Sequence, residues 1–208
     1  MTARKGVVCV FSKAPVVGEV KTRLIPELGA EGAAQLYESL LASTLVQACA
    51  SNVSSVHLYC FPDASHPGFQ YYADKHDLIL VNQSGSDLGE RMHRAIEQEL
   101  LEFDYAMVLG CDCPWLKSEE LSYACEILET GKDAVLGPAS DGGYYLIGLR
   151  QPQAQLFSAM TWGGSQVLAE TRSRMQDSGL EWVELNEYRD VDLPEDLPDY
   201  ERLLRQES

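Results

Sequence analysis

Hydrophobic residues recur with two different periods along the chain, and the two periods alternate from one segment to the next. Short apolar or alternating runs predict β-strands at residues 7–11, 56–61, 78–81, 105–109, 134–136, 144–149 and 182–185. Apolar residues three and four positions apart predict helices at residues 31–50, 69–75, 88–100, 118–130, 165–178 and 194–204. Strands that alternate with helices favour a mostly parallel sheet with helices on both faces. We therefore expect an α/β fold, with a single domain over residues 1–208.

Polar residues at the predicted helix starts suggest how these helices begin. Asp87 and Glu90 form a capping box before the helix at 88–100, and Ser165 is placed to cap the helix at 165–178. Asp192 precedes Pro194 with the spacing of a good helix start. We expect Asp192 to cap the last helix, whether or not it also binds a metal.

The net charge of the chain limits the kinds of molecule that it can bind. The chain has 16 Lys and Arg against 32 Asp and Glu, so its net charge of -16 repels nucleic acid and anionic lipid. Cations crowd the beginning of the chain, where Arg4, Lys5, Lys13, Lys21 and Arg23 lie, and acids crowd its end. We expect a small-molecule partner held locally, particularly with a divalent cation, and no nucleic acid.

The sequence also indicates where in the cell the protein resides and whether its cysteines are reduced. The first apolar run is too short for a signal sequence, and no stretch approaches the length of a membrane span. The six cysteines are scattered through apolar segments, and the four histidines form no paired motif, so the sequence does not favour a zinc site. We expect a cytoplasmic protein with reduced cysteines.

An acid follows the predicted strand at 105–109. Asp112 stands just beyond this strand, and Pro114 prevents the strand from continuing. An α/β sheet presents ligand-binding residues at this carboxyl edge. Together, Asp112 and the late acid Asp192 offer the hard oxygen ligands that Mg²⁺ or Mn²⁺ prefers. The alternative is that Asp112 is a turn acid that caps the following segment.

A basic loop follows the first strand. Lys13, Lys21 and Arg23 lie in this loop, which lacks the glycines of a P-loop or of a Rossmann motif. Three cations in a kinked loop can clamp phosphates. The alternative is a solvated loop in which Arg23 pairs with a surface acid.

Two glycine-rich loops add candidate substrate contacts. In Asp141-Gly142-Gly143 the glycines allow close backbone approach to a ligand, and the acid can accept a proton or grip hydroxyl groups. The other reading is a tight turn between two strands. Trp162 is a possible platform for a sugar or base, and burial in the core is its alternative.

Five motifs occur in order along the chain. They read Phe11-Ser12-Lys13-Ala14-Pro15 through Lys21-Thr22-Arg23-Leu24, Leu88-Gly89-Glu90-Arg91-Met92, Gly110-Cys111-Asp112-Cys113-Pro114, Gly137 through Asp141-Gly142-Gly143 to Gly148, and Asp190-Val191-Asp192 through Leu197. Together they resemble a small bacterial family often labelled radical-SAM/selenodomain-associated transferase, within the nucleotide-diphospho-sugar transferase superfamily. The resemblance covers essentially the whole chain and implies a GT-A-like α/β fold with a mixed central sheet.

The resemblance also implies roles for individual residues. Lys13, Lys21 and Arg23 match the loop that meets the nucleotide phosphates, although the usual glycine-rich form of that loop is missing. Phe11 and Ser12, in the first of the five motifs, are expected to bind the nucleotide as well, as is Asp112.

The acids match the superfamily's metal site. Asp112 stands at the metal-binding strand end, although the usual D-x-D is reduced to Asp112-Cys113-Pro114. Asp192 resembles the late acid that completes the metal site in related nucleotidyltransferases. The Lys-x-Arg-Leu run is also similar to the phospholactate guanylyltransferase pattern.

Three functions follow as hypotheses. The first is a glycosyltransferase in which Asp112 and Asp192 hold Mg²⁺ or Mn²⁺ on a nucleotide-sugar donor. Lys21 and Arg23 then stabilise the leaving charge, and Asp141, with Gly142, Gly143 and Trp162, meets a small-molecule acceptor. The second is a nucleotidyltransferase that joins CTP or GTP to a phosphorylated acceptor and releases pyrophosphate. The third is a non-catalytic nucleotide-binding module. The base, sugar, acceptor, stereochemical outcome and oligomeric state stay open.

Overall fold

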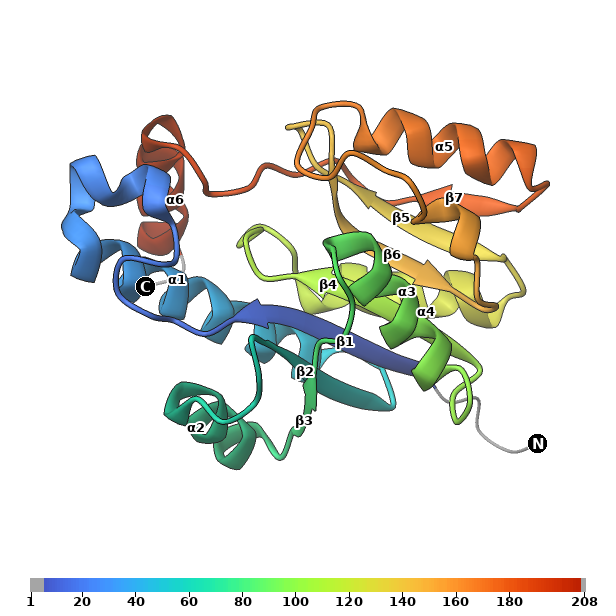
Figure 1. Cartoon of the computed structure of the whole chain (residues 1–208), viewed down its shortest axis with the longest axis horizontal. Coiled ribbons are helices and arrows are strands. Elements are labelled where there is room, and N and C mark those ends of the chain that lie inside the picture. The colour runs from blue at the N-terminus through green and yellow to red at the C-terminus, as the bar shows by residue number, and fades with distance from the viewer. Residues whose placement is uncertain (1–5, 207–208) are drawn as a thin grey trace.

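Seven strands form one sheet in the computed structural model, which describes residues 6–206, and Figure 1 shows how the sheet and the helices are arranged. The order across the sheet is β3-β2-β1-β4-β6-β5-β7. The strands are β1 Gly6–Lys13, β2 Ser55–Phe61, β3 Ile79–Asn82, β4 Tyr105–Gly110, β5 Ala134–Pro138, β6 Tyr144–Leu149 and β7 Trp182–Glu184. Strand β6 runs antiparallel to both of its neighbours, and all other strand pairs are parallel. This confirms the predicted α/β fold with a mostly parallel, mixed sheet.

Helices cover both faces of this sheet. They are α1 Ile25–Ala50, α2 Pro67–His76, α3 Leu88–Glu99, α4 Ser118–Glu129, α5 Val167–Asp177 and α6 Leu197–Gln206, with 3₁₀ turns at Thr22–Leu24, Ala154–Leu156 and Pro194–Asp196. Within residues 6–206 none of these helices combines the length and the hydropathy that crossing a membrane requires.

The alternation along β1 explains the two layers. Val8 and Val10 point into a core cluster shared with α1, α2 and α4, and Val7 and Cys9 point into a second cluster shared with α3 and α5. Because successive side chains of a strand face opposite sides, an apolar run such as β1 needs cover on both faces. The helices predicted from period 3.6 supply that cover.

Helix α1 begins earlier than the sequence pattern indicates. The predicted start was residue 31, whereas the helical segment begins at Ile25, with Pro26 in its first turn. Gly29 interrupts it with non-helical angles of φ 71° and ψ 166°. The regular periodicity therefore begins only after this glycine, which is why the pattern does not reveal the preceding turn.

Helix α5 is not capped by Ser165, so this prediction was wrong. The helix begins at Val167, its N-cap residue is Gln166, and no side chain caps it. Instead, the N–H of Leu168 donates to the carbonyl of Gly142 at 2.8 Å. A loop distant in sequence thus satisfies one of the free N–H groups of the helix start.

Candidate active site

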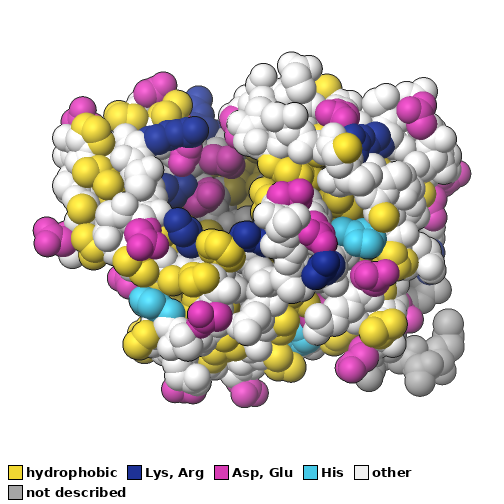
Figure 2. All heavy atoms as spheres, viewed as in Figure 1, with side chains coloured by type: hydrophobic (Ala, Val, Ile, Leu, Met, Phe, Trp, Pro, Cys, Tyr) yellow, Lys and Arg dark blue, Asp and Glu magenta, His cyan; other side chains and the backbone are white. Residues whose placement is uncertain are grey.

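A cleft lies at the carboxyl ends of β1 and β4. Its larger compartment has a volume of about 580 Å³. The lining residues are Phe11, Ser12, Lys13, Glu19, Val20, Lys21, Tyr37, Phe61, Gln83, Leu88, Arg91, Gly110, Cys111, Asp112, Cys113, Tyr144, Tyr145, Asp190 and Asp192. Figure 2 shows acidic and basic side chains gathered beside a hollow on this face of the molecule. The acid predicted at the end of β4 therefore opens onto a cleft.

A smaller compartment of about 170 Å³ adjoins the larger one. The residues that line it are Leu88, Met92, Asp141, Gly143, Tyr144, Trp162, Gly163, Gly164, Val167 and Asp190. Leu88, Tyr144 and Asp190 line both compartments. A separate hollow of about 400 Å³ beside Trp115 and α6 contains none of the predicted site residues. The two connected compartments are therefore the candidate site.

The late segment reaches β4 through Val191. This side chain is fully buried with Leu40 of α1 and Tyr200 of α6, and its N–H donates to the carbonyl of Asp112 at 2.9 Å. Asp190 and Asp192, on either side of it, both line the larger compartment. The apolar anchor thus brings two late acids to the acid at the end of β4.

Lys21 lies between the two acids predicted to bind metal. Its Nζ is 2.7 Å from Asp112 Oδ1 and 3.6 Å from Asp192 Oδ1, and only 4% of its side chain is exposed. Burial lowers the pKa of Lys21, but the ion pair with Asp112, helped by Asp192, outweighs burial and leaves the pKa raised. The ammonium is therefore a fixed positive charge at the centre of the acids.

Arg23 lies farther out, at the rim. It forms an ion pair with Asp192, and 67% of its side chain is exposed. Arg23 does not line the larger compartment among the described residues. Lys13 does line it, and its Nζ donates to the carbonyl of Glu19 at 2.9 Å. Of the loop cations, Lys13 and Lys21 are placed for a ligand in the cleft, and Arg4 and Lys5 lie outside the described residues.

Asp190 also lines the site, although it was not among the site residues predicted from the sequence. Burial, followed by the charges of Asp112 and Asp141, raises its pKa to about 7. Its position where the compartments meet was signalled in the sequence only by the Asp190-Val191-Asp192 spacing, in which two acids flank one apolar residue.

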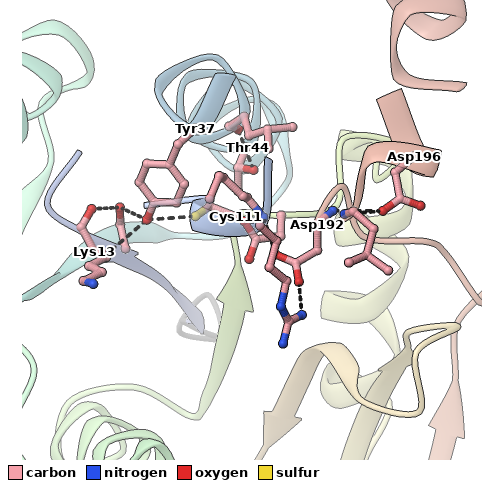
Figure 3. Close-up of polar contacts among 12 residues, drawn as sticks. Lys13, Tyr37, Thr44, Cys111, Asp192 and Asp196 are labelled. Carbon is pink, nitrogen blue, oxygen red and sulfur yellow. Dashed lines mark hydrogen bonds and ion pairs between the residues drawn. The ribbon is translucent and has the colours of Figure 1, made fainter. Parts of the chain in front are cut away.

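The prediction that Asp192 caps the last helix was wrong. The N-cap residue of the 3₁₀ turn before α6 is Leu193. The capping carboxylate belongs to Asp196, whose Oδ2 accepts from the N–H groups of Asp192 at 3.0 Å and Leu193 at 2.8 Å (Figure 3). Because Asp196 provides the cap, the carboxylate of Asp192 does not cap the helix and instead pairs with Lys21 and Arg23.

The acids have the right chemistry for a divalent ion. Carboxylate oxygens of Asp112 and Asp192 are the ligands that Mg²⁺ and Mn²⁺ prefer. No group of three or more His, Cys, Asp or Glu side chains is arranged to hold an ion among the residues that the structure describes. An ion held by these two acids would therefore need further oxygen ligands from a phosphate or from water.

Tyr37 of α1 joins the ends of β1 and β4. Its hydroxyl accepts from the N–H of Lys13 at 2.8 Å and lies 3.0 Å from the hydroxyl of Ser12, while the thiol of Cys111 donates to it at 3.4 Å (Figure 3). Phe11 stacks on Tyr59 with ring centroids 5.3 Å apart. Sequence periodicity had indicated only a core position for Tyr37.

We expect Tyr37→Phe to destabilise the protein by about 1 to 3 kcal/mol, because the partly buried N–H of Lys13 loses its acceptor. Urea unfolding measures the loss. Tyr123→Phe on the exposed face of α4 removes a hydroxyl from a side chain that is 50% exposed and serves as the control. Equal stability of the two variants would contradict a structural role for the Tyr37 hydroxyl.

The loop at 141–143 packs against a neighbouring segment of the fold and also lines the smaller compartment. Asp141 Oδ1 accepts from the N–H of Gly143 at 2.8 Å, and both residues line the compartment. Gly142 has φ 91°, and a Cβ there would lie 2.2 Å from the carbonyl oxygen of Ser165. The close approach of Gly142 is therefore to the segment just before α5.

Trp162 forms a wall of the smaller compartment. Its ring lies edge-on to Tyr144 with centroids 6.4 Å apart, and a Cβ at Gly89 would lie 2.5 Å from the indole. The indole Nε1 is buried and has no hydrogen-bond partner within the described chain. Trp162 is thus partly a packing residue and partly a surface of the compartment.

The fold is the α/β fold found among nucleotide-diphospho-sugar transferases and nucleotidyltransferases. The chain belongs to the bacterial family described as "Uncharacterized protein conserved in bacteria (DUF2064)", whose model matches residues 44–164. A search of the curated proteins gives no significant match.

Solved structures extend this assignment. A "putative nucleotide-diphospho-sugar transferase" from Desulfovibrio desulfuricans G20 is 31% identical, with a TM-score of 0.83, over 91% of this chain and 83% of that one. CMP:2-keto-3-deoxy-manno-octonic acid synthetase complexed with CTP is 12% identical, with a TM-score of 0.62, over 98% of this chain and 100% of that one.

A sugar transferase also shares the fold. Glucosyl-3-phosphoglycerate synthase from Mycobacterium tuberculosis, in complex with Mn²⁺, UDP and glucosyl-3-phosphoglycerate, is 11% identical, with a TM-score of 0.57, over 95% of this chain and 75% of that one. At these low identities, the synthetase and the synthase show the fold alone.

Proposed function

We propose that this protein is a metal-dependent glycosyltransferase that moves a sugar from a nucleoside-diphosphate donor to a small acceptor. The observation that carries the proposal is the junction at Asp190, where a compartment containing cations and acids meets a smaller one with an aromatic wall. A donor needs a phosphate site beside a site for the transferred group, and the two compartments supply adjoining spaces of these kinds.

The larger compartment suits the nucleotide part of the donor. Phe11, supported by its stack on Tyr59, offers an aromatic surface for a base, and Ser12 and Lys13 lie at the end of the same strand. Lys21 and, at the rim, Arg23 place positive charge where the diphosphate leaves. These contacts give the basic loop its role in the proposal.

A divalent ion completes the phosphate site in this proposal. Asp112 and Asp192 would hold Mg²⁺ or Mn²⁺, and the ion would neutralise charge on the leaving diphosphate. Because Lys21 pairs with both acids, the ammonium competes with an ion for these carboxylates. We therefore infer that the ion binds together with the nucleotide, whose phosphates supply both ligands for the ion and a new partner for Lys21.

Asp141 is the proposed base for the acceptor. It borders the smaller compartment together with Gly143 and Trp162. A carboxylate at this place can accept the proton of an attacking hydroxyl group.

Nucleotidyl transfer is the second candidate, and one observation favours it. Lys13, Lys21 and Arg91 all line the larger compartment, and three cations suit a triphosphate. In that reaction a phosphorylated acceptor attacks the α-phosphate of CTP or GTP, and pyrophosphate leaves.

The product distinguishes the two reactions. We expect the purified protein with Mn²⁺ to release nucleoside diphosphate from one member of a panel of UDP-, GDP- and ADP-sugars, with slow transfer to water when no acceptor is present. Phosphorus NMR identifies the product, and a chelator should abolish its formation. Release of pyrophosphate from CTP or GTP with a phosphorylated acid acceptor, without sugar release from any donor, would establish the second candidate instead.

A further inference from the structure

The two compartments differ in their charged side chains, because both are lined by acids but cations line only the larger one. The larger one has Lys13, Lys21 and Arg91 on its wall. Among the described residues that line the smaller one, the only ionisable side chains of Asp, Glu, Lys, Arg or His type are Asp141 and Asp190. A ligand in the smaller compartment therefore meets carboxyl groups and no lining cation.

Helix α3 contributes residues to both compartments, and its Arg91 lines only the larger one. Leu88 and Met92, four residues apart and hence on one side of the helix, line the smaller compartment. Arg91 lines the larger compartment, where its guanidinium lies 4.0 Å from the centre of the Phe61 ring, and its Nε donates to the carbonyl of Gly85. These two contacts hold the guanidinium of Arg91 at the wall of the larger compartment.

Apart from the two carboxyl groups, the wall of the smaller compartment is mostly apolar. Trp162, Tyr144 and Val167 line it together with Met92. An apolar surface next to carboxyl groups favours a ligand with an apolar face and without negative charge, because an anion would be desolvated there without a counter-ion.

We propose that the acceptor is an uncharged or cationic hydroxyl compound with an apolar face, and that phosphorylated and carboxylated compounds are excluded. This inference rests on the proposed glycosyl transfer. The acceptor oxygen forms a bond to the anomeric carbon, the bond from that carbon to the phosphate oxygen breaks, and the nucleoside diphosphate leaves with the bonding electrons. The proton of the hydroxyl passes to Asp141 and then to water. The same charges disfavour the phosphorylated acceptor that nucleotidyl transfer requires.

Three phenols of nearly equal size test the preference for charge. They are 2-(4-hydroxyphenyl)ethanol, which is neutral, tyramine, which is cationic, and 4-hydroxyphenylacetate, which is anionic. We expect the first two to bind at least about tenfold more tightly than the anion, as measured by calorimetry in the presence of Mn²⁺ and UDP or GDP, a difference of about 1.4 kcal/mol. Equal or tighter binding of the anion, or no binding by any of the three, would overturn the inference.

Leu88 offers a charge variant outside the proposed chemistry. Its side chain is 45% exposed and borders both compartments, so it tolerates a longer polar side chain. Leu88→Lys should reduce the discrimination against the anion, whereas Leu88→Gln, which is polar without a charge, should retain it. Unchanged discrimination in Leu88→Lys would show that charge in this compartment does not select the ligand.

Failure of this inference is distinguishable from failure of the proposed function. If a sugar nucleotide is split to nucleoside diphosphate while anionic phenols bind best, the glycosyl transfer stands and the acceptor class is wrong. If the neutral and cationic phenols bind as expected but no sugar nucleotide is split, the selectivity of the compartment stands and the glycosyl transfer is wrong.

Discussion

Asp112→Asn is expected to lower turnover by at least about 100-fold, the scale of losing one strong electrostatic contact in a transition state. Asn keeps the shape of the side chain but loses the charge that pairs with Lys21 and that a divalent ion needs. Steady-state formation of the nucleoside diphosphate measures turnover, and calorimetry with Mn²⁺ measures the accompanying loss of metal-dependent nucleotide binding. A variant with near wild-type turnover would exclude Asp112 as an essential ligand.

The same variant should also lose some stability, roughly 1 to 2 kcal/mol, because a buried ammonium loses its nearer partner while Asp192 remains 3.6 Å away. The matched control is Asp177→Asn, which removes the same charge at the exposed end of α5.

A second readout is the pKa of Asp190, which burial and then Asp112 raise to about 7. In Asp112→Asn this pKa should fall while staying above the ordinary range for aspartate, as carbon NMR can determine.

Lys21→Met is expected to strengthen Mn²⁺ binding in the absence of nucleotide by about tenfold or more. The ammonium lies within 4 Å of both Asp112 and Asp192, and its removal frees the two carboxylates for an ion. Turnover should nevertheless fall by about 100-fold, because the leaving diphosphate loses a positive charge that no water molecule replaces. Electron paramagnetic resonance of free Mn²⁺ gives the affinity without any need for activity.

Lys132→Met controls for the loss of a lysine, since Lys132 pairs with Glu181 on the surface. It should change neither Mn²⁺ affinity nor turnover. If Lys21→Met binds Mn²⁺ no more tightly than the wild type, then the ammonium does not compete with the ion. If its turnover is also unchanged, Lys21 has no part in the chemistry.

Local signals were sufficient where one element decides its own structure. The capping box before α3 is an example, since Asp87 Oδ1 accepts from the N–H of Glu90 at 2.9 Å as predicted. The carboxylate of Glu90 accepts from Ser86 at 2.7 Å, one residue before the position that a standard capping box uses. Local signals failed at Ser165 and Asp192, where Gly142 and Asp196 take over the capping.

The residues of the candidate site also differ in whether local sequence signals or only long-range contacts reveal them. Asp112 was predictable because an apolar strand ends beside it and Pro114 follows, a pattern contained within one short segment. Tyr37 was not, because a hydroxyl that joins β1 to β4 looks in the sequence like any other residue of a helix stripe.

The sequence by itself determined the strands, the helices, the two-faced apolar sheet and the acid at the end of β4, because hydrophobic periodicity records which sides of an element are buried. Only the tertiary structure decided that Lys21 lies between Asp112 and Asp192 and that Asp190 stands where the compartments meet. These positions depend on the burial of Val191 against α1 and α6 and on its hydrogen bond to Asp112. Contacts between segments far apart in the chain leave no periodic trace in either segment.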